Sequence, residues 1–180
     1  MLTAPAVIEG VRLRLRRSVP GDAAAVFSAA ANPEVMKYMD WPAHRTQADV
    51  QEFLEGCATR WTNGTEFHWM IEEKQTNASV GCLACRPKGH AADFGYFLAR
   101  THWGKGIAQE AAMLLVSWLK RQPEVLRVWA TTDAENHRSA RVLEKAGLRL
   151  EGNLRMATIR PNIGPIPRDT CLYAWVRGDA

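Results

Sequence analysis

Hydrophobic and charged residues alternate over 11–17, which is the pattern of a β-strand with one buried face. Further runs rich in apolar residues are bounded by turn-forming residues, and three of them follow closely enough to predict an antiparallel meander. The strands predicted after the first cover 67–73, 79–86, 93–99, 126–132, a segment from 148 onward, and 170–176. The pattern therefore predicts about seven strands.

Apolar residues at helical spacing lie between these strands. Thr46 and Asp49 have the spacing of a capping box and predict a helix start, while Gly147 predicts a helix end. The predicted helices cover 20–31, a short segment from 33, 46–63, 106–120 and 136–146. This order predicts an α/β (α+β) fold in a single domain over 1–180, with a mostly antiparallel, partly parallel sheet.

Composition agrees with a globular protein of ordinary size. The chain has 180 residues, of which 47% are hydrophobic and 23% charged, so disorder is excluded as its main state. It has no apolar run long enough to span a membrane, and its first nine residues lack the features of a signal peptide, so we expect a cytoplasmic protein. The net charge of +4 comes from scattered Lys and Arg, which supports nucleic-acid binding only weakly.

The four cysteines are expected to be free thiols. Cys82 and Cys85 form a Cys-x-x-Cys pair, but they lie in a predicted strand, where residues three apart point to opposite faces. A shared metal ion or a disulfide is therefore disfavoured, and no metal site is predicted.

The segment Trp103-Gly-Lys-Gly-Ile-Ala108 lies between a predicted strand and the longest predicted helix. Glycines leave the backbone bare, so successive amides at a helix N-terminus can approach a pyrophosphate closely. A strand-to-helix turn that needs glycine only for its dihedral angles is an equally good interpretation at this point. The segment matches neither the Walker A pattern nor the Gly-x-Gly-x-x-Gly dinucleotide pattern, which disfavours ATP and NAD.

A second polar cluster opens the last predicted helix. Asn136 suits an N-cap, because its side-chain oxygen can accept a helix N–H, and Ser139 suits an exposed first turn. Taken alone, these two residues indicate a helix start more strongly than chemistry.

In order and spacing, these segments resemble the GNAT superfamily of acetyltransferases, and within it the Rim-type branch that acetylates N-termini of ribosomal proteins. The resemblance covers nearly the whole chain. Its motifs are Leu13-Arg-Leu-Arg16, Asp22, Asn32-Pro-Glu-Val35, Trp41-Pro42, Gly95-Tyr96, His102-Trp-Gly-Lys-Gly106, Gln109-Glu-Ala111, Asn136-His-Arg-Ser139 and Glu151-Gly152. The family fold has a central sheet splayed in the middle, with helices on both faces.

The resemblance implies acetyl-coenzyme A as cosubstrate. It implies that the backbone amides of Gly104, Lys105, Gly106, Ile107 and Ala108 hold the pyrophosphate, with Trp103 at the position where most superfamily members have Gln or Arg. The pantetheine arm is expected along Phe97 and Leu98, Asn136 is expected to contact coenzyme A, and Ser139 is expected to reach its sulfur.

The resemblance also implies direct attack of the amine on the thioester, with Ser139 as the group that hydrogen-bonds the leaving thiolate. The usual tyrosine of the superfamily is replaced by Leu143, and the Rim-type glutamate falls near Thr158. Asp93 and Glu66 are therefore the candidate bases, acting through water. Tyr38, Trp41 and Trp69 are expected to surround the acceptor, with core packing as the alternative.

The function expected from the sequence is N-acetyl transfer to a protein α-amine or a small-molecule amine. Two alternatives stay open: an acyl-coenzyme A sensor without turnover, and a factor that binds RNA or the ribosome. Neither the acceptor nor the oligomeric state is determined by the sequence, and a homodimer stays open.

Overall fold

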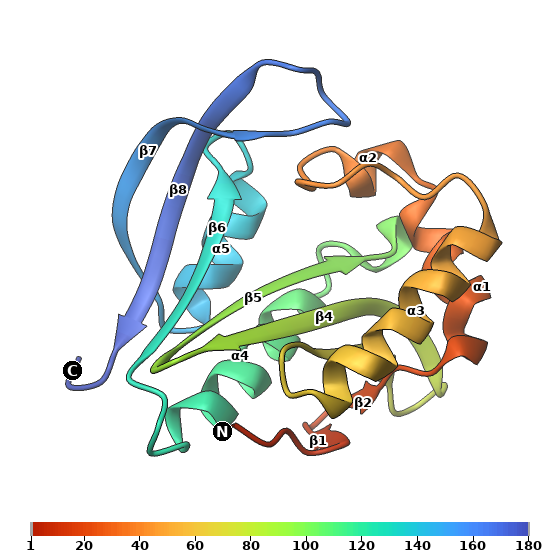
Figure 1. Ribbon diagram of the computed structural model, residues 1–180, viewed down its shortest axis with the longest axis horizontal. Helices are drawn as coiled ribbons and strands as arrows, with labels where there is room; N and C mark the ends of the chain where they lie inside the picture. The colour runs from red at the N-terminus through yellow and green to blue at the C-terminus, as the bar shows by residue number, and fades with distance from the viewer. Residues whose placement is uncertain (1, 180) are drawn as a thin grey trace.

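The predicted meander forms the centre of one eight-stranded sheet. In the computed structural model, which describes residues 2–179, the strand order is β1-β2-β3-β4-β5-β6-β8-β7 (Figure 1). The strands are β1 (Val7–Glu9), β2 (Leu13–Arg17), β3 (Phe67–Glu73), β4 (Ala78–Lys88), β5 (Ala91–Leu98), β6 (Arg127–Asp133), β7 (Arg149–Ile159) and β8 (Pro167–Val176). β5 and β6 form the parallel pair, and the other neighbours are antiparallel. The three-residue β1 is the strand that the alternation pattern did not predict.

The helices lie on both faces of the sheet, as expected (Figure 1). They are η1 (Pro20–Asp22), α1 (Ala23–Ala30), α2 (Pro33–Met36), α3 (Gln47–Thr62), η2 (Arg100–His102), α4 (Ile107–Lys120) and α5 (His137–Lys145). The predicted capping box is confirmed, because Thr46 and Asp49 bond each other's backbone at the start of α3. Within residues 2–179, no helix is both long and apolar enough to cross a membrane.

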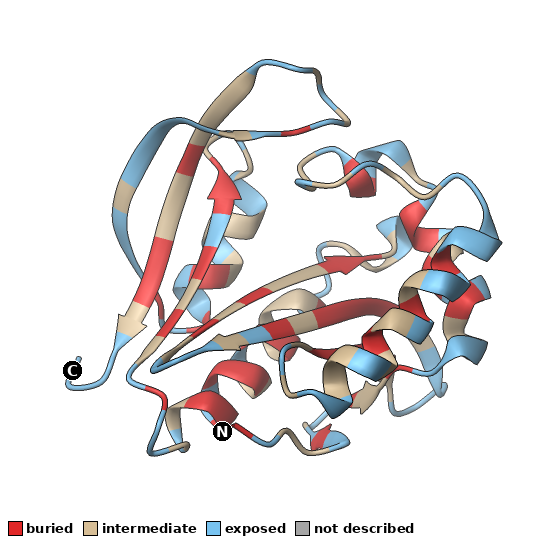
Figure 2. Cartoon of the chain, in the orientation of Figure 1, coloured by how far each residue is buried: buried red, intermediate tan, exposed pale blue. Residues whose placement is uncertain are grey.

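Two hydrophobic clusters fill the space between the sheet and its helices (Figure 2). On the face covered by α4 and α5, called the α4 face here, lie Trp69, Leu83 and Cys85. On the face covered by α1, α2 and α3, called the α1 face, lie Cys82 and Phe97. Cys82 and Cys85 are thus free thiols on opposite faces, as predicted from their spacing.

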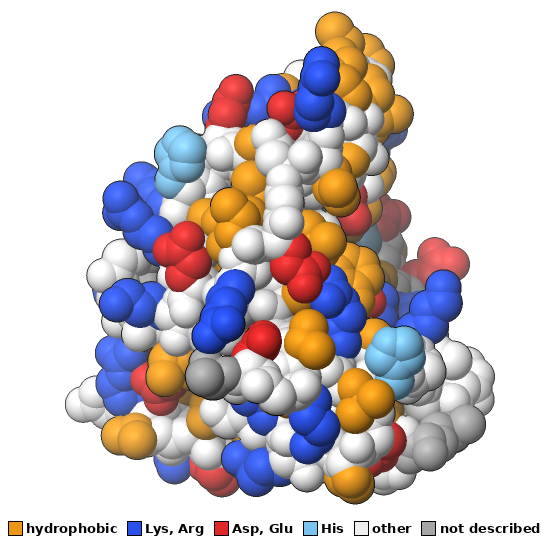
Figure 3. Space-filling view, turned by 90° about the vertical axis from the view of Figure 1, so that its left-hand side faces the viewer, with side chains coloured by type: hydrophobic (Ala, Val, Ile, Leu, Met, Phe, Trp, Pro, Cys, Tyr) orange, Lys and Arg blue, Asp and Glu red, His pale blue; other side chains and the backbone are white. Residues whose placement is uncertain are grey.

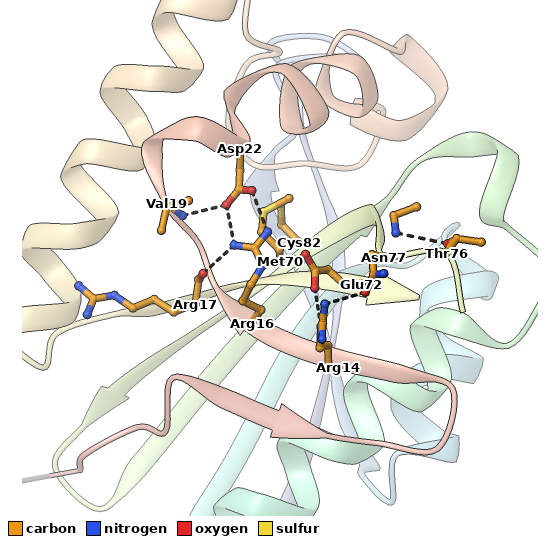
Figure 4. Close-up of polar contacts among 11 residues, drawn as sticks. Arg14, Arg16, Arg17, Val19, Asp22, Met70, Glu72, Thr76, Asn77 and Cys82 are labelled. Carbon is orange, nitrogen blue, oxygen red and sulfur yellow. Dashed lines mark hydrogen bonds and ion pairs between the residues drawn. The ribbon is translucent and has the colours of Figure 1, made fainter. Parts of the chain in front are cut away.

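A buried ionic network fixes the N-terminal strands to the start of α1 (Figure 4). The Arg16 guanidinium donates from Nε to Glu72 Oε1 at 2.8 Å and from Nη2 to Asp22 Oδ1 at 2.8 Å. Arg14 Nε donates to the other Glu72 oxygen at 2.6 Å. Both oxygens of Glu72 are paired with arginine side chains, so the fold alone explains why these charged residues lie together.

Candidate functional site

The sheet opens between β5 and β6. These strands pair at only three positions, the last of which joins Asp93 to Trp129, and then they diverge. Successive residues of a strand direct their N–H and C=O groups to alternate sides. The carbonyl of His90 accepts amides from the β6 side, and the amide of Ala99 donates to Val80 on the β4 side. Even-numbered residues of β5 therefore present their backbone groups to the opening.

This alternation decides which backbone amides of β5 face the opening. The amide of Leu98 faces the opening, and so does that of Tyr96, whereas the main chain of Phe97 faces β4. The Phe97 carbonyl approaches Gly81 so closely that a Cβ built there would lie 2.2 Å from it. Phe97 instead presents its side chain to the α1 face. The splayed strand thus offers donors at alternate residues and not at two consecutive ones.

The glycine segment follows β5 and opens α4. Gly104 and Gly106 have φ values of 77° and 74°, in the left-handed region that favours glycine. Gly106 is the N-cap of α4 and has no side-chain cap. Among residues 2–179, the backbone amides from Gly104 to Gln109 have no hydrogen-bond partner. A row of bare amides at a helix N-terminus is the arrangement that binds phosphate groups.

A brace from β2 holds this segment in place. Glu110, in the first turn of α4, accepts the backbone amides of Arg12 and Leu13 at 2.9 and 3.2 Å and the Arg12 Nε at 2.8 Å. Arg12 Nη1 in turn donates to the carbonyl of Lys105 at 3.1 Å. The hydrogen bond to the Lys105 carbonyl therefore ties the glycine segment to the residues at the start of β2.

The other residues of the segment have different tasks. Ile107 is buried and anchors the helix, Lys105 is exposed, and Ala108 is half-buried. Trp103 donates from Nε1 to the carbonyl of Leu98 at 3.0 Å and lies between the guanidinium groups of Arg100 and Arg138. Trp103 therefore supports the turn through its side chain.

Asn136 and Ser139 adopt the arrangement expected of a helix start. The Asn136 side chain caps α5 by accepting the Ser139 amide at 3.2 Å. The Ser139 hydroxyl oxygen is 3.2 Å from the hydroxyl of Tyr96, which donates to it across the opening of the sheet. Burial raises the pKa of Tyr96 to about 12, so Tyr96 stays protonated and acts as a donor. The hydrogen of Ser139 is then left for another acceptor.

Tyr96 is a further candidate for the site, although the sequence marks it only as part of a motif. Its position in Gly95-Tyr96, on the strand before the glycine turn, was the available signal. The tyrosine expected elsewhere in the superfamily is replaced by Leu143, which is 1% exposed and belongs to the core. The hydroxyl group near Ser139 thus comes from the sheet and not from α5.

The two candidate bases share one arginine. Arg86 Nε donates to Asp93 Oδ2 at 2.9 Å, and Arg86 Nη1 lies 3.8 Å from Glu66 Oε2. Glu66 also accepts from Arg60 at 3.0 Å. Asp93 is the last β5 residue paired with β6, so this cluster lies at the base of the opening. Each carboxylate is therefore already paired with a guanidinium group.

The predicted acceptor residues divide into two groups. Trp41 is half-buried on the α1 face, with its ring 6.3 Å from Phe97, and Tyr38 is half-buried beneath Lys37. Trp69 is fully buried on the α4 face and donates from Nε1 to the carbonyl of Pro5 at 3.1 Å. The predicted contact of Trp69 with the acceptor is therefore wrong, because no solvent-accessible surface remains for one.

A side chain that the sequence analysis missed joins the two walls of this region. The amide of Asn162, in the β7–β8 connection, donates to the carbonyls of Met36 and Trp41 at 2.8 and 2.9 Å. Its Oδ1 accepts the amide of Ala43 at 3.0 Å. The three hydrogen bonds reach the last residue of α2 and the segment that follows it, so Asn162 clasps this part of the chain to the C-terminal hairpin.

Beside this clasp lies a pocket of about 570 Å³. Its polar wall is the ion pair in which Arg168 donates to both oxygens of Asp133, at 2.7 and 3.1 Å. Its apolar wall includes Ile163 and Ile166 of the β7–β8 connection. Opposite charges hold the pKa of Asp133 below its usual value despite the desolvation that opposes this.

Comparison with known proteins agrees with this geometry. The acetyltransferase (GNAT) domain family matches residues 12–149. The chain belongs to the GNAT acetyltransferase family. An uncharacterized N-acetyltransferase of Bacillus subtilis, YoaA, is 28% identical over 174 residues, covering 95% of this chain and 97% of the relative. The ribosomal-protein-serine acetyltransferase of Escherichia coli is 25% identical and covers 66% and 68% of the two chains.

A solved GNAT structure with bound coenzyme A shares the fold. RimJ of Mycobacterium smegmatis in complex with coenzyme A disulfide superposes with a TM-score of 0.81 at 25% identity, covering 96% of this chain and 85% of RimJ. The expectations of a Rim-like GNAT fold and of an N-acetyltransferase that uses acetyl-coenzyme A are confirmed. The site residues stay predictions.

Proposed function

We propose that this acetyltransferase moves the acetyl group to a primary α-amine by direct attack, and that residues of the splayed strand, the glycine turn and α5 perform the transfer. The observation that carries this proposal is the row of amides from Gly104 to Gln109, which has no partner among residues 2–179 and opens beside the diverging strands. Acetyl-coenzyme A supplies the activated acetyl group when it is bound. The domain is expected to extend over 1–180, whose two end residues lie outside the described part.

The residues present fit the cosubstrate. Bare amides at the start of α4, together with Lys105, suit a pyrophosphate, and glycines at 104 and 106 leave space beside it. The amides of Tyr96 and Leu98 suit a ligand that lies along β5 as an added strand. One of these amides is the donor that we assign to the thioester carbonyl, where it stabilises the developing negative charge.

Ser139 is the residue that we assign to the leaving sulfur. A serine hydroxyl is a poor general acid, but it can donate a hydrogen bond to a thiolate. Tyr96 occupies one lone pair of the Ser139 oxygen and thereby directs the Ser139 hydrogen away from itself. Tyr96 is on this assignment a positioning residue, because it acts through Ser139.

Asp93 is the first candidate for removing the proton of the ammonium, through water, because it lies where the strands part. Glu66 is the second candidate, since the same Arg86 connects the two carboxylates. Trp41 and Tyr38 are assigned to the acceptor wall that the Asn162 clasp holds in place. A peptide N-terminus or an amino acid in the cytoplasm is the acceptor that we favour, and a homodimer stays a prediction.

Calorimetric titration with acetyl-coenzyme A tests the cradle, and we expect saturable binding with one site per chain. Absence of binding at millimolar concentration would overturn the proposal. Thiol release on incubation with an amine panel then separates an enzyme from a sensor. The sensor alternative is favoured by Leu143 and Thr158, which stand where the superfamily and its Rim-type branch have catalytic side chains. A sensor would bind acetyl-coenzyme A without releasing thiol.

A further inference from the structure

One buried cation in this region has no hydrogen bond. Arg160 follows β7 directly, and 5% of its side chain is exposed. Its Nε has no hydrogen-bond partner, and no other side-chain nitrogen of Arg160 donates to any group of residues 2–179. A guanidinium group has five donors in a fixed fork, and a buried one is normally paired. Arg160 Nε is therefore a buried donor without a hydrogen-bond partner in residues 2–179.

The neighbouring charged residues form no hydrogen bond with Arg160. Asp133 Oδ2 lies 3.9 Å from Arg160 Nε, but both oxygens of Asp133 are occupied by Arg168 and by the amide of Glu135. Arg168 repels Arg160, and the exposed Asp40 attracts it without forming a hydrogen bond. Asp40 also attracts Arg86.

The position of Arg160 connects it with the acceptor. It lies two residues before Asn162, whose side chain holds the segment that carries Trp41. Its nearest carboxylate, Asp133, ends β6, the strand that borders the opening of the sheet. Ala130 belongs to the α4 face, so the alternation of the strand places Asp133 on the opposite face of the sheet, which is also the face of Phe97.

We propose that Arg160 binds a carboxylate of the acceptor, which makes the acceptor an amine that also carries an acid group. The planar guanidinium fork matches the two oxygens of a carboxylate. Asp40 supplies the charge that attracts the ammonium end of the same molecule. Two sources fit: a free amino acid, or a peptide with Asp or Glu near its N-terminus. Polyamines do not fit, because they would meet Arg86, Arg160 and Arg168. This inference rests on the proposed function.

The test compares matched acceptors in the thiol-release assay. The pairs are L-serine with ethanolamine, and the peptide amide Ser-Glu-Ala-Ala with Ser-Gln-Ala-Ala. We expect the acid member of at least one pair to have a kcat/KM about 10- to 100-fold higher. The pair that shows the difference identifies the source of the carboxylate. Equal values in both pairs, or a preference for spermidine, would overturn the inference and leave the acetyltransferase activity standing.

Arg160→Gln should remove this selectivity. We expect the KM of the acid acceptor to rise about 10- to 100-fold, with a much smaller change in kcat and in the KM of acetyl-coenzyme A. Arg155→Gln is the matched control, because Arg155 is an exposed arginine of the same hairpin with no partner in residues 2–179. An equal rise in the KM of the acid acceptor in both variants would show that only the overall positive charge matters, and not the position of Arg160. If Arg160→Gln does not fold, Arg160→Lys serves instead, since it keeps the charge and loses the fork.

Binding without turnover separates the two proposals. Titration of the same acceptors into the coenzyme A complex measures affinity where no acetyl group is present. Carboxylate-selective binding that Arg160→Gln abolishes, in a protein that releases no thiol with any amine, would support the site and overturn the enzymatic proposal. Equal affinity for acceptors with and without the carboxylate would overturn the Arg160 site but not the enzymatic proposal.

Discussion

The two halves of the sheet are built differently. The half formed by β2 to β5 is covered by helices on both faces, and six of the seven residues of β3 are buried. The half formed by β6, β8 and β7 has helices on its α4 face only, and β7 is exposed along most of its length. Figure 3 views the molecule from the side on which β7 lies in Figure 1, and it shows hydrophobic side chains among charged ones there. We therefore expect the first half to contribute most of the stability of the fold, while the second forms one wall of the candidate site.

The strongest test of this comparison removes one large side chain from each half. Trp69→Ala should lower the free energy of unfolding by about 3–5 kcal/mol, because it leaves a cavity among buried aromatic rings. Leu154→Ala on β7 should cost about 0.5 kcal/mol or less, since Leu154 is 45% exposed. Urea denaturation of both variants gives the two values. Similar losses would show that the halves do not differ in this way.

The glycine turn should affect binding far more than folding. Gly106→Glu places an anion beside the phosphates, and we expect the affinity for acetyl-coenzyme A to fall about 100-fold or more. The cost in stability should be about 1–2 kcal/mol, because φ at Gly106 is 74°. Titration calorimetry measures the first effect and urea denaturation the second. Gly106→Ala is the control for strain, and an equal loss of affinity in both variants would exclude repulsion as the cause.

The hydroxyl pair that joins the two halves should affect turnover. Ser139→Ala should lower kcat about 10-fold, with the affinity for acetyl-coenzyme A nearly unchanged, because it removes one hydrogen bond to the leaving sulfur. Tyr96→Phe should have a smaller effect of the same kind. Steady-state kinetics of both variants and of the double variant checks the arrangement. Since Tyr96 acts through Ser139, the second substitution should add little to the first, and fully additive losses would contradict this.

The clasp should have a modest effect on folding and a selective effect on the acceptor. Asn162→Ala removes three hydrogen bonds between the hairpin and the segment after α2, and we expect a loss of about 1 kcal/mol in stability. The KM of the acceptor should rise several-fold while that of acetyl-coenzyme A stays constant. Kinetics with each substrate varied in turn measures both values. A larger change in the KM of acetyl-coenzyme A than in that of the acceptor would show that the clasp supports the cosubstrate side of the site and not the acceptor side.

Local patterns made most elements of the fold predictable. The capping box at Thr46, the glycine turn and the opposite orientations of Cys82 and Cys85 depend on residues close together in the chain. These features follow from helix spacing and strand alternation alone. β1 is too short to show an alternation, so its strand depends on pairing with β2.

The missed parts of the site depend on contacts between distant segments. Asn162 reaches carbonyls more than 120 residues earlier in the chain, and no local pattern marks such a contact. Trp69 and Trp41 are the same residue type, yet one lies in the core and the other beside the acceptor region. Burial of an aromatic residue is decided by the helix packed against its strand, which composition does not reveal.

The narrow seam between β5 and β6 has a consequence for solvent exchange. Only three residue pairs cross it, so the amides of Tyr96 and Leu98 are not protected by a neighbouring strand. A ligand seated there would act as a missing strand and slow deuterium uptake at these two positions, while uptake in β3 would stay as slow as before. On the proposed assignment, acetyl-coenzyme A would complete the sheet at this seam each time it binds.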